Sequence, residues 1–173
     1  NSVYNGNMKI PGKIHFDKIF RPRPAVFLFL LVFIFQGTRV EGDPPPVILA
    51  LGDSLTAGYG VPEQESYPSR LQAILKNKGY NYVIINAGVS GDTTAGGLHR
   101  LPWLLQHKPK IVILALGAND GFRGLPVSQM YSNLKQIIQL CQEEKAVVLL
   151  AGIKIPPNYG EEYSRQFEDV FVQ

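Results

Sequence analysis

The chain has 173 residues, of which 45% are hydrophobic and 18% charged, a composition typical of a single globular domain. The net charge of +3 lies at the N-terminus: residues 1–42 hold six Lys/Arg against two acidic residues, and residues 43–173 hold eleven against twelve. The larger part is nearly neutral and lacks the basic excess typical of nucleic-acid-binding proteins. We therefore expect no nucleic-acid partner.

Residues 1–42 have the pattern of upstream residues followed by a secretory signal peptide. Scattered basic residues lead into an apolar run of eleven residues, 25–35, and small and polar residues follow up to Gly42. This run is shorter than the roughly 20 residues that span a bilayer. We expect a periplasmic or secreted protein without a stable membrane anchor, whose mature domain occupies residues 43–173. A transmembrane anchor is the alternative interpretation.

Four apolar runs predict strands over residues 47–51, 82–87, 111–116 and 146–151. Apolar residues at helical spacing predict intervening helices from Tyr67 to about 78, over about 96–106 and over 127–141, and a further helix near Glu161. Ser66 has the pattern of an N-cap for the first of these. The alternation of strand and helix predicts an α/β fold with three α/β/α layers, in which helices cover both faces of a flavodoxin-like, doubly wound parallel sheet.

Cys141 is the only cysteine, so an intrachain disulfide is excluded. It falls on an apolar stripe of the helix over 127–141. This position predicts a buried thiol that acts as a small hydrophobic side chain.

Glycine-rich polar turns follow the strands, whereas the connections from helix to strand are plainer. The first turn, Gly52-Asp53-Ser54, ends a buried strand abruptly. Ligands of open α/β sheets bind beyond the carboxyl ends of the strands, so Ser54 is a candidate nucleophile. The alternative is that Asp53 or Ser54 only caps the next helix.

Two later turns should meet the first at the same edge. The turn after the second strand contains Gly91, whose backbone N–H can approach a ligand closely. The turn after the third contains Asn119, whose amide can donate to a developing oxyanion. A serine with such preorganised donors is suited to acyl transfer through a tetrahedral intermediate.

These motifs resemble the GDSL, or SGNH, hydrolases. Gly52-Asp53-Ser54-Leu55, Gly91 and Gly117-Ala118-Asn119-Asp120 match the first three sequence blocks of that family. The match is closer still to one branch, the bacterial periplasmic arylesterase/thioesterase/lysophospholipase group. It rests on four blocks in the same order and at similar spacing: Gly52 to Gly60, Ser90-Gly91-Asp92-Thr93, Gly117 to Gly121 and Pro157-Asn158-Tyr159-Gly160. The resemblance covers roughly residues 47–173.

The resemblance implies the SGNH hydrolase fold and a role for each matched residue. Ser54 would be the nucleophile, and its own N–H, the N–H of Gly91 and the Asn119 side chain would form the oxyanion hole. The substrate-binding residues would be Asp53, Pro157, Asn158 and Tyr159, although the position of Asp53 also fits a loop brace. The substrate would be a small acyl ester, thioester or lipid, hydrolysed without cofactor or metal. We expect a monomer.

One element of the family pattern is absent. The family takes its general base from an Asp-x-x-His near the C-terminus, and the histidines here are His15, His99 and His107. None of them follows an aspartate by three residues. We expect His99 and His107 to be solvated surface residues. The sequence would then be a fragment, inactive as it stands, that lacks the final strand, the catalytic loop and the last helix.

Three other interpretations stay open. A carbohydrate O-acetyl esterase of the same superfamily would use identical chemistry on a smaller acyl group. A degenerate homologue would bind lipid without turnover. A flavodoxin-like module would bind a phosphate at the first turn, although the Asp53 carboxylate would repel that anion.

Overall fold

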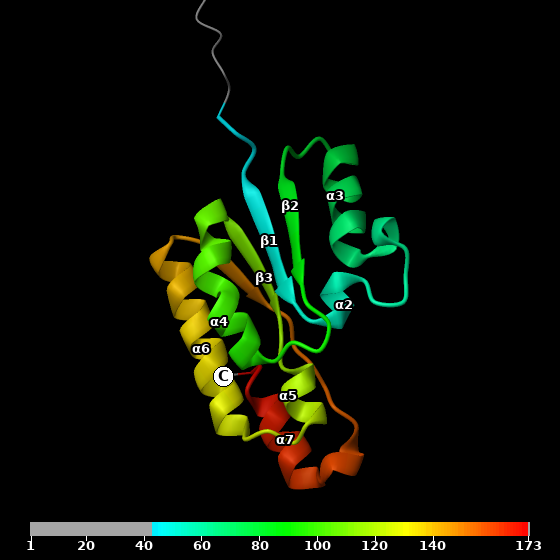
Figure 1. The fold of residues 1–173 in the computed structure, drawn as a ribbon, viewed down its shortest axis with the longest axis vertical. Helices are drawn as coiled ribbons and strands as arrows, with labels where there is room; N and C mark the ends of the chain where they lie inside the picture. The colour runs from blue at the N-terminus through cyan, green and yellow to red at the C-terminus, as the bar shows by residue number, and fades with distance from the viewer. Residues whose placement is uncertain (1–42, 173) are drawn as a thin grey trace, which may run out of the picture. The chain divides into compact units, whose positions relative to one another are not determined.

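The computed structural model describes residues 43–172, so the signal peptide expected over 1–42 lies outside the described residues. Four parallel strands form one sheet in the order β2-β1-β3-β4. Gly52 pairs in register with both Gly88 and Ala115. The carboxyl ends of β1, β2 and β3 therefore lie at one edge of the sheet (Figure 1). The strands span Val47–Gly52 (β1), Val83–Gly88 (β2), Ile111–Ala115 (β3) and Val147–Leu150 (β4).

Helices cover both faces of this sheet. Helix α3 (Tyr67–Asn77) packs against β2, while α4 (Thr94–Leu104) and α6 (Val127–Glu143) pack together on the opposite side (Figure 1). This follows from the strand order, since right-handed crossovers to either side of β1 place their helices on opposite faces. Helix α7 (Glu161–Asp169) follows β4. The predicted α/β fold with a doubly wound parallel sheet is confirmed.

Two segments that the sequence indicated only as turns contain short helices. Helix α2 (Ser54–Ala57) follows β1, and α5 (Ala118–Phe122) follows β3. Both are too short for their apolar spacing to be read as helical periodicity. Single 3₁₀ turns add η1 (Glu63–Glu65), η2 (Leu105–His107) and η3 (Pro157–Tyr159).

The longer elements agree with the prediction within a few residues. Ser66 caps α3, and its hydroxyl accepts the Ser69 N–H at 3.4 Å. Helix α4 begins two residues before the predicted start, because the Thr93 hydroxyl caps it by accepting the Gly96 N–H at 3.3 Å. Its predicted end at residue 106 falls within η2.

The core lies between the sheet and the α4–α6 pair. Cys141 is fully buried within it, as predicted from the apolar stripe. No helix formed by residues 43–172 is long and apolar enough to cross a bilayer. The core includes Leu49 and Leu51 of β1, Val112 and Leu114 of β3, Leu101 of α4, Ile137 of α6 and Phe167 of α7.

Candidate active site

The first loop places Ser54 at the carboxyl end of β1, as the first residue of α2. Asp53 is the N-cap of this helix, and its Oδ1 accepts the Leu55 N–H at 3.0 Å. The capping function that was the alternative for this pair therefore belongs to Asp53. Ser54 is half-buried, and its hydroxyl is not required for the cap.

The second loop turns at Gly91, whose φ of +81° is a conformation that favours glycine. The Val89 N–H donates to the Gly52 carbonyl at 3.0 Å, which fixes this loop to the end of β1. The Gly91 carbonyl accepts a hydrogen bond from Arg123 Nη2 at 2.7 Å. The loop of the exposed Gly91 is thus held by hydrogen bonds to the end of β1 and to Arg123.

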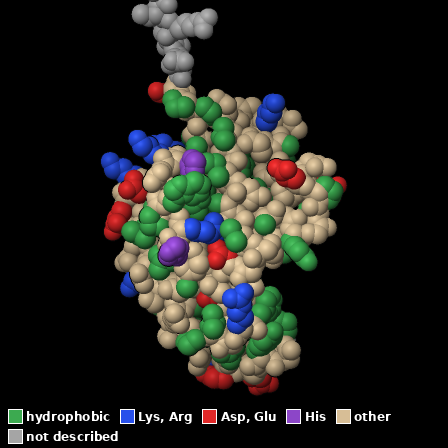
Figure 2. Space-filling model, in the orientation of Figure 1, with side chains coloured by type: hydrophobic (Ala, Val, Ile, Leu, Met, Phe, Trp, Pro, Cys, Tyr) green, Lys and Arg blue, Asp and Glu red, His purple; other side chains and the backbone are tan. Residues whose placement is uncertain are grey.

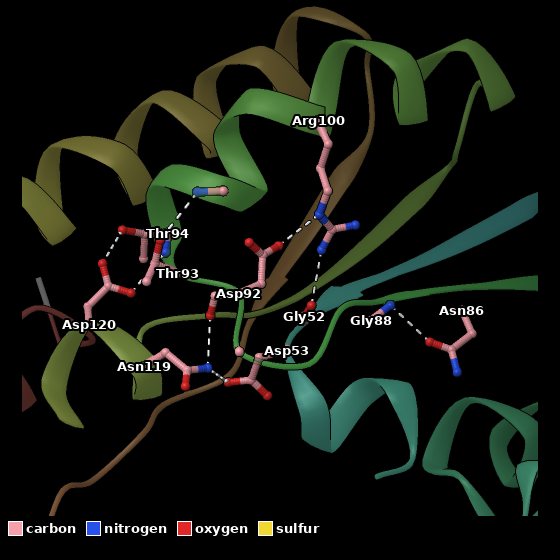
Figure 3. Close-up of polar contacts among 12 residues, drawn as sticks. Gly52, Asp53, Asn86, Gly88, Asp92, Thr93, Thr94, Arg100, Asn119 and Asp120 are labelled. Atoms are coloured by element: carbon pink, nitrogen blue, oxygen red, sulfur yellow. Dashed lines mark hydrogen bonds and ion pairs between the residues drawn. The ribbon is translucent and has the colours of Figure 1, made fainter. Parts of the chain in front are cut away.

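The third loop contributes Asn119, which lies in the first turn of α5. Its Nδ2 donates to the Asp92 carbonyl at 2.9 Å and to Asp53 Oδ2 at 3.3 Å (Figure 3). One side chain therefore connects all three loops at the sheet edge. The predicted convergence of these loops is present in the structure.

Asp53 was expected either among the substrate-binding residues or as a loop brace, and its contacts are those of a brace. The residue is only 3% exposed, and its two carboxylate oxygens accept hydrogen bonds from Leu55 and Asn119. A buried carboxylate that accepts from both the first loop and α5 braces them against each other.

Asp92 and Arg100 are two residues at the site to which the sequence alone assigned no role. Arg100 Nε lies 2.8 Å from Asp92 Oδ2, and Arg100 Nη2 donates to the Gly52 carbonyl at 3.0 Å. Both side chains are mostly buried, at 21% and 12% exposure. The sequence signal for Arg100 is its place directly before Leu101, an apolar position of the predicted helix, where a charged side chain lies close to the core.

A second polar cluster joins α4, α5 and α6. The Asp120 carboxylate accepts the Thr94 N–H at 2.9 Å and the Thr94 hydroxyl at 2.6 Å. The Asn133 amide donates to the same hydroxyl at 3.0 Å. All three residues are buried. This cluster fixes α5, and with it Asn119, against the two longer helices.

The phenol of Tyr67 contacts the first loop through Thr56. The Thr56 hydroxyl donates to the Tyr67 hydroxyl at 3.5 Å. Burial raises the pKa of Tyr67, the hydrogen bond from Thr56 lowers it, and the Asp53 carboxylate raises it further. The net pKa lies above the ordinary value, so Tyr67 stays neutral at neutral pH.

The Pro157–Tyr159 segment, expected to bind substrate, forms η3. The Tyr159 ring lies 6.2 Å from that of Phe122, at the end of α5. These two rings are 38% and 50% exposed, and Asn158 is exposed. The segment thus borders the loop of Asn119 through an aromatic pair.

His99 and His107, the two histidines within residues 43–172, are both exposed, as expected (Figure 2). His99 lies on α4, and the His107 ring in η2 meets Trp103 edge to face at 5.7 Å. Among residues 43–172, no group of His, Cys, Asp and Glu side chains has the arrangement of a metal site. Neither histidine is positioned by these contacts to activate Ser54.

Comparison with known proteins agrees with this architecture. The chain is 48% identical over 125 residues to an arylesterase of Vibrio mimicus, a match that covers 72% of this chain and 62% of the relative. It is 37% identical over 159 residues to thioesterase 1/protease 1/lysophospholipase L1 of Escherichia coli (strain K12), with 91% and 72% covered. The chain thus spans about three fifths of the length of the Vibrio relative.

A solved structure shows the same fold. The crystal structure of AlinE4, an SGNH-hydrolase family esterase, matches with a TM-score of 0.71 at 46% identity, and the match covers 74% of this chain and 69% of that one. Residues 50–172, which include all three loops of the site, match the GDSL-like Lipase/Acylhydrolase family. The chain belongs to this family.

Proposed function

We propose that the protein is a serine esterase that hydrolyses acyl esters or thioesters through an acyl-enzyme on Ser54. The observation that carries this proposal is the junction at Asn119, whose amide joins the Ser54 loop to the Gly91 loop. The junction lies at the carboxyl edge of β1 and β3. In a doubly wound sheet of this order, that edge is the switch point where ligands bind.

In the proposed reaction, Ser54 Oγ attacks the acyl carbonyl carbon and gives its proton to a general base. The carbonyl π electrons move onto oxygen, where the N–H groups of Ser54 and Gly91 and the Asn119 amide donate to the oxyanion. Collapse expels the alkoxide or thiolate, which leaves with a proton. Water then attacks the acyl carbon and gives a proton to the base, the bond from that carbon to Ser54 Oγ breaks, and Ser54 takes the proton back as the acid leaves. We assign the base to neither His99 nor His107.

The rim of the site supports an apolar acyl or aryl group. Phe122, the last residue of α5, and Tyr159, in η3, have partly exposed rings that lie next to each other. Aromatic surfaces of this kind provide apolar contact area for a substrate. The names of the arylesterase and thioesterase relatives agree with this substrate class.

The test is hydrolysis of p-nitrophenyl butyrate by the full-length protein and its Ser54→Ala variant. We expect Ser54→Ala to abolish turnover and to prevent labelling by a fluorophosphonate, because both require the same nucleophile. Ser132→Ala, at an exposed serine of α6, is the matched control and should retain both. Turnover that survives in Ser54→Ala would refute the proposal.

We further propose that the protein is exported. The support is the order of basic, apolar and small residues over 8–42. N-terminal sequencing of the exported protein should give a start between about Gly37 and Pro45. A mature protein that keeps residues 27–35 in the membrane would support the anchor interpretation instead.

A further inference from the structure

Arg100 contacts two loops of the site at once. On α4 its guanidinium pairs with the Asp92 carboxylate at 2.8 Å through Nε and donates through Nη2 to the Gly52 carbonyl at 3.0 Å (Figure 3). Gly52 ends β1 two residues before Ser54, and Asp92 follows Gly91. One planar group therefore contacts both the strand end that precedes Ser54 and the loop that contains Gly91.

The Asp92 carboxylate packs tightly against α4. A Cβ at Gly96 would overlap the Asp92 carboxylate, so α4 has no side chain where that carboxylate lies. The Asp92 backbone carbonyl in turn accepts the Asn119 amide at 2.9 Å. A continuous set of contacts thus runs from Arg100 through Asp92 to the Asn119 amide.

Gly52, the other partner of Arg100, is also closely packed. Its carbonyl accepts both the Val89 N–H at 3.0 Å and Arg100 Nη2 at 3.0 Å. A Cβ at Gly52 would lie 2.9 Å from the Ala115 carbonyl oxygen. The strand end therefore contacts the second loop, Arg100 and β3, and has no room for a side chain at Gly52.

We propose that Arg100 is a positioning residue for the acyl-transfer site. Resting on the proposed function, its role is to align the Gly91 and Asn119 donors with Ser54. A planar fork can satisfy a carboxylate and a carbonyl together, whereas a lysine ammonium is a single point charge. Arg100 does not reach the reacting atoms, so it acts on the transition state through the donors that it aligns.

This role predicts a particular kinetic signature. Oxyanion donors act mainly in the transition state, and losing one lowers kcat by about 10²–10³-fold. Misaligned donors should have a smaller effect, on the order of 10–100-fold in kcat with KM within about threefold. An ion pair that served only stability would lower the melting temperature and leave kcat of the folded enzyme unchanged.

The experiment compares Arg100→Met, Arg100→Lys and Arg100→Ala in the full-length protein, with Arg70→Met as the matched control. Arg70 is an exposed helical arginine of α3 that lies 3.7 Å from Glu65. We expect reduced kcat in all three Arg100 variants and wild-type kcat in Arg70→Met. Millimolar guanidinium should restore part of the kcat of Arg100→Ala, because it can occupy the vacated site, whereas ammonium should not.

A second readout does not need turnover. The NMR signals of the Asn119 side-chain amide should shift in Arg100→Met and stay in place in Arg70→Met. If the wild type showed no Ser54-dependent hydrolysis, the proposed function would fail, and this shift would still test the positioning role. Unchanged Asn119 signals, wild-type kcat in folded Arg100→Met, or loss of folding in both Arg100→Met and Arg100→Lys would overturn the proposal.

Discussion

The Asn119 side-chain amide has two hydrogens, and both are donated within the protein. The acceptors are the Asp92 carbonyl at 2.9 Å and Asp53 Oδ2 at 3.3 Å. To donate to an oxyanion as well, Asn119 must weaken one of these bonds. The bond to Asp53 is the longer, so we expect it to yield while the bond to Asp92 keeps the amide oriented.

Asn119→Ala tests the donor role at the level of a single residue. We expect kcat to fall by on the order of 10²-fold with a smaller change in KM, since the lost bond forms mainly in the transition state. The measurement is steady-state hydrolysis of p-nitrophenyl butyrate. Asn77→Ala, at the exposed end of α3, is the control. A rise in KM at constant kcat would instead indicate a role in ground-state binding.

The convergence of Ser54, Gly91 and Asn119 was predictable because each follows a strand by only a few residues. Their common edge is then fixed by the direction of a parallel sheet. Arg100 and Thr94 were not predictable in the same way. Their contacts depend on how α4 turns and packs over β1 and α5, and no local pattern in the sequence specifies that packing.

At the level of elements, α2 lies directly on the end of β2. A Cβ at Gly88 would overlap the backbone nitrogen of Ala57 and lie 2.6 Å from the Thr56 carbonyl carbon. These atoms belong to α2, which begins at Ser54. The absence of a side chain at Gly88 is therefore a condition for the position of the nucleophile turn.

Gly88→Ala should displace α2. We expect a loss of about 1–3 kcal/mol in the free energy of unfolding, because backbone atoms cannot move aside as a flexible side chain can. Urea denaturation measures this loss. Gly152→Ala is the matched control, since its Cβ would meet only Phe171 Cβ at 3.9 Å. A midpoint for Gly88→Ala equal to that of the control would contradict the close packing of α2 and β2.

The strands and long helices were predictable because their apolar patterns extend over several turns or a full strand. In α6, the buried positions Met130, Leu134, Ile137 and Cys141 repeat at three and four residues. Helices α2 and α5 have only four and five residues. The Asp53 cap sets α2 and the contacts of Asp120 with Thr94 set α5, so sequence periodicity could not reveal either helix.

At the level of the whole molecule, Cys141 reports on the integrity of the core. Its side chain is fully buried between α6 and the sheet, and burial raises the pKa of the thiol to about 11. A thiol reagent needs both access and the thiolate. In the native state, Cys141 therefore reacts only when the core opens.

We expect a disulfide reagent at pH 8 to label native Cys141 at least about 10³-fold more slowly than the urea-unfolded chain, as the opening equilibrium of a stable domain requires. Fast labelling in the native state would mean that α6 opens locally. Cys141→Ala should show no labelling, because the chain has one cysteine, and this variant identifies the reactive group.

The same thiol makes the stability of the fold depend on alkaline pH. The unfolded thiol loses its proton near its ordinary pKa of 9.0, whereas the folded thiol keeps it up to about 11. Between these values the native state binds more protons than the unfolded state, so the free energy of unfolding falls as pH rises. Urea midpoints from pH 8 to 10.5 should therefore decline more steeply for wild type than for Cys141→Ala, in which all other titrating groups are unchanged. Parallel curves for the two proteins would show that the thiol ionises equally in both states, contrary to its burial in the core.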